Sequence, residues 1–121
     1  MSAPAWIGVA IVGSLGSLAR FLLDGAVSAR SPSSFPLGTL AVNASGAFIL
    51  GLLTGLALSG EALTLAGSAT IGSYTTFSTW MFETERLAEE RERSRAWANV
   101  LVSLVLGVAA AALGRLIGEH L

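Results

Sequence analysis

The chain has no cysteine and no lysine among its 121 residues, and its one histidine is His120. Without cysteine the chain has no disulfide and no thiolate metal ligand, and one histidine cannot build the usual zinc or haem sites. Only 12% of the residues are charged, and they gather between apolar stretches, so no basic face for nucleic acid is expected. Redox chemistry and nucleic-acid binding are therefore disfavoured, and we do not expect an enzyme.

What the chain has instead is apolar sequence. Hydrophobic residues make up 53% of it and its mean hydropathy is +0.70, which is typical of an integral membrane protein. A helix needs roughly 20 apolar residues to cross a bilayer. Four stretches meet this need, at residues 6–23, 36–58, 62–82 and 97–117. The first lacks a basic leader, so we expect it to be a retained helix. The predicted fold is an all-α membrane protein, one four-helix domain over residues 1–121.

The connections differ in kind. Residues 24–35 contain a Ser-Pro-Ser-Ser run and are predicted to be a loop, whereas residues 59–61 are so few that the flanking helices must be antiparallel neighbours. Residues 83–95 alternate acids and bases at helical spacing, which indicates a solvated helical extension of the third span.

Arginine placement indicates an orientation. Four spans place both termini on the same side of the membrane. On that side Arg115 is the only arginine near the end of a span. By the positive-inside rule the termini then face outward. The remaining six arginines lie on the side of the first and third connections: Arg20, Arg30, Arg86, Arg91, Arg93 and Arg95.

The third stretch carries a hydroxyl-rich run, Gly-Ser-Tyr-Thr-Thr-Phe-Ser-Thr over residues 72–79. Gly72, Thr75 and Thr76 weaken helix propensity together, so we expect a helix broken at mid-membrane. Such a break leaves backbone groups that only protein, water or an ion can satisfy. Carbonyl oxygens suit a hard cation, while amides and hydroxyls, here including Ser78 and Thr79, suit an anion.

Phe77 and Trp80 follow the run at a spacing of three, on one helix face. The edge of an aromatic ring is positive, so such rings can line an anion path without a fixed cation that would trap the ion. The alternative is an ordinary core or lipid-facing pair, which is what aromatics at helical spacing usually are.

Polar and small residues form two ridges, one along the second stretch and one along the fourth. In the second, steps of four join Thr39, Asn43, Ala47, Gly51 and Gly55. The three small residues favour close helix packing, within the subunit or across a dimer, and Asn43 has either a functional role or an interhelical hydrogen bond.

The second ridge, in the fourth stretch, consists of Asn99, Ser103 and Gly107. Serine alone is weak evidence for function, because its hydroxyl can bond the carbonyl four residues back in its own helix.

Arg20 and Glu83 are the charges nearest the ends of the first and third stretches. Either side chain can extend to the membrane–water interface. Arg20 can instead pair with Asp24 or attract anions into a vestibule. No carboxylate precedes Asp24, and the second stretch has none. A proton-coupled exporter of cationic drugs needs such a group at mid-depth, so this alternative is disfavoured.

Three patterns resemble the Fluc fluoride-channel family, also called CrcB. They are Gly13-x-x-Gly16-x-x-x-Arg20-Phe21, then Gly38-Thr39-Leu40-x-Val42-Asn43-x-x-Gly46-x-Phe48, then Gly72-x-x-Thr75-Thr76-Phe77-Ser78-Thr79 followed by Glu83. The third is highly specific, and the resemblance covers essentially the whole chain.

The resemblance implies an antiparallel dimer with two fluoride pathways and a structural Na⁺ on the dimer axis. It implies passive fluoride export across the cell membrane. By analogy the carbonyls of Gly72 and Thr75 hold Na⁺. The implied fluoride route includes Asn43, Phe77, Ser78, Thr79 and Ser103, to which we add Trp80, Thr39 and Arg20.

The chain departs from the family pattern at Trp80, where a second phenylalanine is usual, at Asn99, where an aromatic hydroxyl is frequent, and at Gly107, where a hydroxyl is expected. The arginine bias is also unlike a homodimer of dual topology, which should show almost none. We expect a homodimer, with a heterodimer of inversely inserted paralogues as the alternative. A small multidrug exporter and a non-conducting structural subunit remain as other functions.

Overall fold

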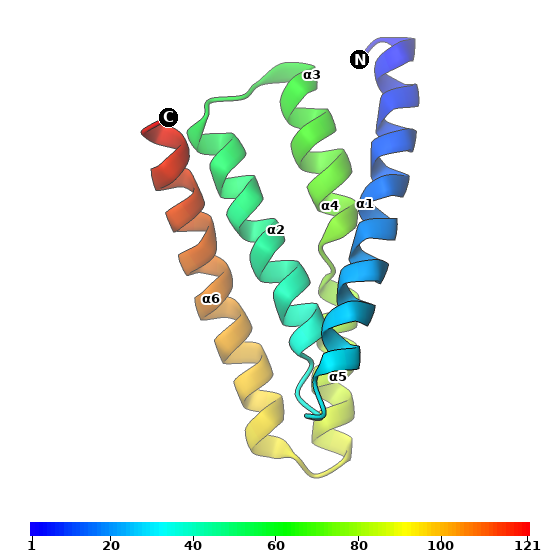
Figure 1. The fold of residues 1–121 in the computed structure, drawn as a ribbon, viewed down its shortest axis with the longest axis vertical. Coiled ribbons are helices and arrows are strands. Elements are labelled where there is room, and N and C mark those ends of the chain that lie inside the picture. The colour runs from blue at the N-terminus through cyan, green and yellow to red at the C-terminus, as the bar shows by residue number, and fades with distance from the viewer.

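The computed structural model describes all residues 1–121, and its regular elements are all helices (Figure 1). Three helices are long and apolar enough to cross a membrane: α1 (Ala3–Arg30), α2 (Leu37–Gly55) and α6 (Arg93–Glu119). Together with the composition they confirm an all-helical membrane protein with several spans. The remaining elements are α3 (Gly60–Leu63), a π-helical segment (Thr64–Ile71), α4 (Gly72–Tyr74) and α5 (Phe77–Glu89).

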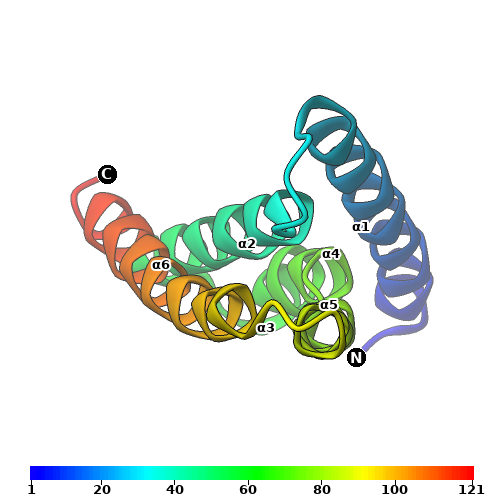
Figure 2. The same ribbon diagram turned by 90° about the horizontal axis from the view of Figure 1, so that it is seen from below.

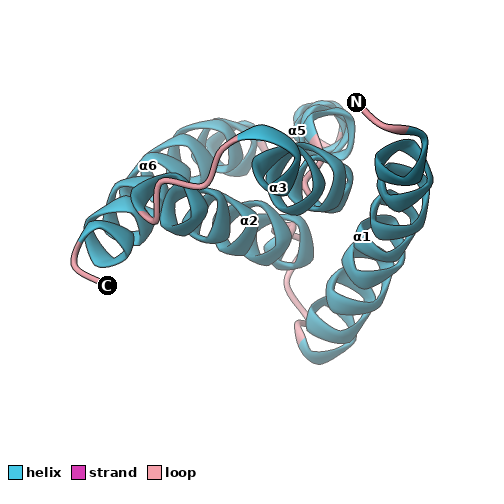
Figure 3. Ribbon diagram, turned by 90° about the horizontal axis from the view of Figure 1, so that it is seen from above, coloured by secondary structure: helices cyan, strands magenta, loops and turns pink.

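The termini and the α2–α3 connection lie at one end of the molecule, and the other two connections lie at the opposite end (Figure 1). Seen along the helices, α1 and α6 flank a middle formed by α2 and the α3–α5 segment (Figures 2 and 3). Only 17 of the 121 residues are buried, and large apolar side chains cover the outside of α1 and α6. Such a surface needs lipid or a partner around it.

α1 is longer than the sequence indicated. The prediction of a loop over residues 24–35 was wrong for its first half, because α1 continues to Arg30. The Ser28 hydroxyl donates to Asp24 at 3.2 Å, and Gly38 of α2 packs against both residues, so this last part of the helix has tertiary support. It ends where Ser31 turns extended, as the residue before Pro32 is biased to do.

α2 and α6 pack backbone to backbone. Gly51 lies against the Ala111 carbonyl and Gly55 against that of Arg115, while Gly114 lies against the Phe48 carbonyl. A side chain at any of these glycines would collide with main chain of the facing helix. Close approach of this kind is the usual use of small residues in membrane helices. The structure thus places Gly51 and Gly55 inside the subunit.

α1 meets the α3–α5 segment through another glycine. A Cβ on Gly16 would collide with Ser73 of α4 and with the Thr70 carbonyl of the π-helical segment. π-helical turns are rare and often occur near functional sites. The contact fixes the end of α4, where the chain leaves the helix.

The prediction of one helical extension over residues 83–95 was wrong at its centre, because α5 ends at Glu89, the chain turns with Arg91 at φ 63°, and α6 begins at Arg93. The ion pairs of this connection, such as Arg86–Glu90 at 3.5 Å, lie at the surface and stabilise little. Ser34 of the first connection reaches this turn, since its hydroxyl donates to Glu92 at 3.1 Å and its carbonyl accepts from Arg86 at 3.3 Å. These bonds tie the two connections at that end together.

Candidate functional site

The helical path is interrupted at Thr75 and Thr76, between α4 and α5 (Figure 1). Both residues are extended, Thr75 with φ −81° and ψ 160° and Thr76 with φ −146° and ψ 122°. The interruption lies within the stretch for which the sequence predicts a break. An interrupted helix leaves main-chain donors and acceptors that need other partners.

Asn43 of α2 supplies two of those partners. Its side-chain Nδ2 donates to the Thr76 carbonyl at 2.8 Å, and the Thr76 N–H donates to Asn43 Oδ1 at 2.8 Å. Thr76 is 9% exposed, so its main chain has little access to solvent. A carboxamide carries both a donor and an acceptor, and here it satisfies both groups of one extended residue. Asn43 therefore stabilises the extended conformation of Thr76 within the interruption.

The Gly72 and Thr75 carbonyls have lost their helical donors. In a continuous helix the Gly72 carbonyl would accept from the Thr76 N–H, which donates to Asn43 instead. The Thr75 carbonyl would accept from the Thr79 N–H, which donates to Thr76 Oγ1 at 3.2 Å. These are the two carbonyls that the family resemblance implies as ligands of a cation.

The start of α5 is rich in hydroxyls. Thr76 caps the helix, and its Oγ1 lies 3.2 Å from Thr79 Oγ1 and 3.4 Å from Ser78 Oγ. The first amides of a helix have no helical acceptor and carry partial positive charge. Hydroxyls and helix-start amides are the kind of donor that an anion needs, and of these the Thr79 N–H already donates to Thr76 Oγ1.

Phe77 and Trp80 form an edge-to-face pair, with ring centroids 5.7 Å apart and planes at 84°. Phe77 is 70% exposed in the single chain, although it is a large apolar side chain. The Trp80 side chain has a fixed position, because its indole N–H donates to the Asn99 carbonyl of α6 at 3.0 Å. Asn99 in turn donates its side-chain N–H to the Trp80 carbonyl at 3.3 Å and to Thr84 Oγ1 at 2.8 Å. No local pattern in the sequence indicates this pairing.

A small cavity of about 210 Å³ brings together three residues predicted for the fluoride route, Asn43, Trp80 and Ser103. Leu104, Gly107 and Val108 complete its wall. Ser103 Oγ is buried there without a hydrogen-bond partner. The cavity wall is mostly apolar, and the Ser103 hydroxyl has no protein partner.

A second cavity, of about 180 Å³, lies between α1, α2 and the start of α5. Arg20, Thr39 and Thr79 line it, and so do Asp24 and Thr76. Arg20 makes no ion pair with Asp24, although both face this space. Thr39 is 2% exposed and its hydroxyl donates to Glu83, a contact that the sequence did not indicate. Thr76 lines this cavity, and its partner Asn43 lines the cavity that contains Trp80 and Ser103.

A third cavity, of about 320 Å³, lies between α2 and the π-helical segment. Gly72 and Thr75 line it together with Asn43, Gly46 and Ala47. Ala47 therefore differs from Gly51 and Gly55, which face α6, although all three belong to one predicted ridge.

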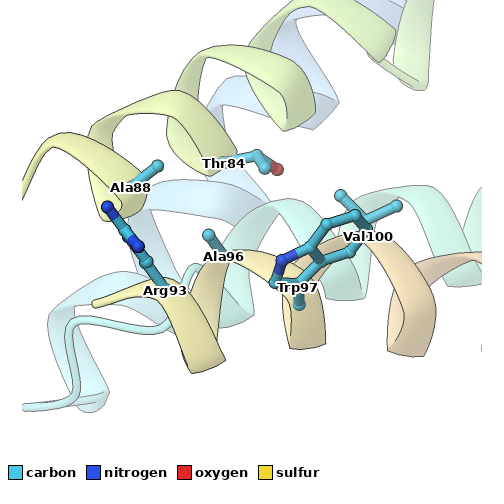
Figure 4. Close-up of a pocket in the computed structure, with 6 residues that line it drawn as sticks. All are labelled: Thr84, Ala88, Arg93, Ala96, Trp97 and Val100. Carbon is cyan, nitrogen blue, oxygen red and sulfur yellow. The ribbon is translucent and has the colours of Figure 1, made fainter. Parts of the chain in front are cut away.

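The largest cavity holds none of the predicted site residues. It measures about 460 Å³ and lies between α5 and α6, with Arg93 at one end and Trp97 and Val100 at the other (Figure 4). Thr84, the partner of Asn99, also reaches it (Figure 4). Because no residue predicted for an ion pathway reaches it, this cavity is not part of the candidate site.

Residues 7–115 match the profile of the family described as CrcB-like protein, Camphor Resistance (CrcB). The chain is 59% identical over 114 residues to the fluoride-specific ion channel FluC 2 of Mycolicibacterium paratuberculosis, covering 94% of this chain and 93% of that protein. It is 54% identical to FluC 2 of Mycobacterium tuberculosis (strain ATCC 25618 / H37Rv), covering 94% and 90%. It is 45% identical over 117 residues to the fluoride-specific ion channel FluC 1 of Leifsonia xyli, covering 93% and 85%.

Proposed function

The chain belongs to the CrcB family, and on that basis we propose that it is a fluoride-selective ion channel that lets F⁻ leave the cell passively across the cell membrane. It is an ion channel and not an enzyme. Passive export protects the cytoplasm from fluoride that enters as HF, because the anion formed inside then has a way out.

One observation supports this proposal above the others. Asn43 bonds the interruption at Thr76, and each of these two residues lines a cavity that contains predicted route residues. A small, strongly hydrated anion needs successive donors that replace its water, each weak enough to release it. Hydroxyls, a carboxamide and aromatic edges are donors of this kind.

The proposed route begins at Arg20 and Thr39, where the unpaired guanidinium attracts anions. It continues past Ser78 and Thr79 at the start of α5 and reaches the ring edges of Phe77 and Trp80. The second Asn43 N–H and the Ser103 hydroxyl complete it. No fixed cation lies beside the inner part, so the ion can leave.

The proposal includes a fourth span, in which residues 60–89 cross the membrane as two helical halves, and a second copy of the chain. One small helix bundle fills its own axis and leaves no continuous pore. The exposed Phe77 ring and the open cavity beside Gly72 and Thr75 are surfaces that a second copy would complete. An antiparallel homodimer would have two pathways, and a heterodimer with an inversely oriented paralogue is the alternative.

A structural Na⁺ fits the residues present. The Gly72 and Thr75 carbonyls are hard oxygen ligands without their helical donors, which is the chemistry that a small cation needs. When bound, the ion would supply positive charge that neutralises these carbonyl dipoles and joins the two subunits. The side chain of Asn43 contributes by keeping the Thr76 amide away from the Gly72 carbonyl.

The test is fluoride efflux from liposomes that contain the purified protein, followed with a fluoride electrode. We expect rapid F⁻ efflux and no Cl⁻ efflux, with no need for a proton gradient. Efflux that requires a proton gradient would instead support an exporter, and correctly assembled dimers without flux would support a structural subunit. Empty liposomes give the background rate.

Orientation needs a separate experiment. Single cysteines placed near the C-terminus and in residues 90–92 can be labelled from either side of intact cells, because the chain has no cysteine of its own. Labelling of each position from both faces indicates dual insertion and supports the homodimer. Labelling of each position from one face only indicates a fixed orientation and hence a partner inserted the other way.

A further inference from the structure

Ser103 Oγ is the one buried side-chain nitrogen or oxygen atom of this chain that has no hydrogen-bond partner. A serine in a helix usually donates its hydroxyl to the carbonyl three or four residues back. Ser14 does so to Ala10 at 2.7 Å, and Ser73 does so to Ala69 at 2.7 Å. Ser103 Oγ makes no hydrogen bond at all, although it is buried.

The carbonyl four residues before Ser103 is that of Asn99. This oxygen accepts the Trp80 indole N–H at 3.0 Å. A carbonyl oxygen has two lone pairs, and the helical amide of Ser103 is the ordinary partner of the other. The indole therefore occupies the carbonyl four residues back, which is one of the two acceptors that a helical serine hydroxyl can use.

The Trp80 indole is held in this position from both sides. The Asn99 side chain donates back to the Trp80 carbonyl at 3.3 Å and to Thr84 Oγ1 at 2.8 Å. Asn99 is 1% exposed, so solvent does not compete for these bonds. On the other side the Phe77 ring packs edge to face on the indole. Trp80 thus has one well-defined place.

We infer that Trp80 is a positioning residue for the anion route: its indole N–H occupies the Asn99 carbonyl and so keeps the Ser103 hydroxyl free to donate to an anion in the cavity with Asn43. This inference rests on the proposed channel function. It gives the tryptophan a role that a phenylalanine ring cannot fill, since phenylalanine has no N–H. It also predicts that the effect of a substitution at residue 80 depends on whether residue 103 carries a hydroxyl.

The test is a double-mutant cycle on the rate of fluoride efflux. Ser103→Ala removes the donor, and we expect roughly a tenfold slower rate, as for the loss of one hydrogen bond to a charged group. Trp80→Phe lets the hydroxyl return to the Asn99 carbonyl, and we expect a similar loss. The double variant should be no slower than either single one. Wild-type rate in Trp80→Phe, or losses that multiply in the double variant, would overturn the inference.

A second measurement does not depend on flux or on any Trp80 variant. In protein labelled with ¹⁵N-tryptophan, one of the three indole N–H groups, that of Trp80, should exchange slowly with deuterium in wild type and in Ser103→Ala. Fast exchange of all three would contradict the bond itself. Ser14→Ala, which removes a hydroxyl bonded within its own helix, is the matched control and should conduct as wild type.

The two proposals fail in different ways. If wild-type liposomes release no fluoride, the channel function is wrong. If they release fluoride and the losses multiply, the channel function stands and the role of Trp80 is wrong.

Discussion

The Asn43 carboxamide and the Thr76 main chain form two hydrogen bonds, one in each direction and both 2.8 Å long. This pair joins α2 to the interruption between α4 and α5. It gives one side chain two tasks, because the second N–H of the same carboxamide remains for the proposed route.

Asn43→Ala should reduce fluoride efflux at least about tenfold and should also destabilise the fold, since unpaired buried groups cost about 1–3 kcal/mol each. The dimer should still assemble, because Asn43 is one contact among many along α2. Efflux rates, thermal unfolding in detergent and size-exclusion chromatography measure the three effects. Full efflux in this variant would remove Asn43 from the route.

The control for Asn43 is Ser45→Ala. Ser45 lies on the same helix and bonds the Tyr74 hydroxyl at 2.9 Å, so its loss also removes a contact between α2 and α4. It touches neither Thr76 nor the cavity with Ser103. We expect near wild-type efflux, which separates the loss of any α2 contact from the loss of this one.

Phe77→Ile should slow fluoride efflux by up to about tenfold, the range of a single aromatic edge contact. Isoleucine keeps the apolar bulk but has no positive ring edge. Because Phe77 is 70% exposed in the single chain, we expect little change in the stability of the subunit. Efflux and chromatography of the same preparation check both points. Unchanged efflux would indicate that the ring only faces lipid or the partner.

The sequence predicted an all-helical membrane protein with several spans, because this follows from composition and hydropathy. The end of α1 was missed for a tertiary reason. Residues 24–30 look like a polar connection, and they stay helical because Gly38 of α2 packs on Asp24 and Ser28.

The partners of the candidate site could not be predicted from spacing alone. The helix period places Asn43 among small residues of α2, but only the three-dimensional structure pairs it with Thr76. In the same way Trp80 and Asn99 are departures from a family pattern in the sequence, and the fold makes them partners. Long-range hydrogen bonds leave no local trace, so neither pairing had a sequence signal.

Gly114→Val should prevent stable folding of the subunit. A Cβ at Gly114 would collide with the Phe48 carbonyl on α2, and main chain cannot move aside as a flexible side chain can. Gly25→Ala on α1 is the control, since nothing lies within 4 Å of its added Cβ, and alanine favours helix over glycine by about 1 kcal/mol. The midpoint temperature of thermal unfolding should fall sharply for Gly114→Val and rise slightly for Gly25→Ala. Equal stability of Gly114→Val and wild type would contradict the backbone packing of α2 and α6.

Na⁺ should stabilise the assembled protein, and K⁺ or N-methyl-D-glucamine should not. A ligand at a hundredfold excess over its Kd adds about 2.7 kcal/mol, so thermal unfolding with and without Na⁺ measures the effect. Thr75→Val keeps the carbonyl and should keep the Na⁺ effect. Asn43→Ala releases the Thr76 N–H, which can then return to the Gly72 carbonyl, so the Na⁺ effect should weaken. An Asn43→Ala protein that responds to Na⁺ as wild type does would place the ion away from these carbonyls.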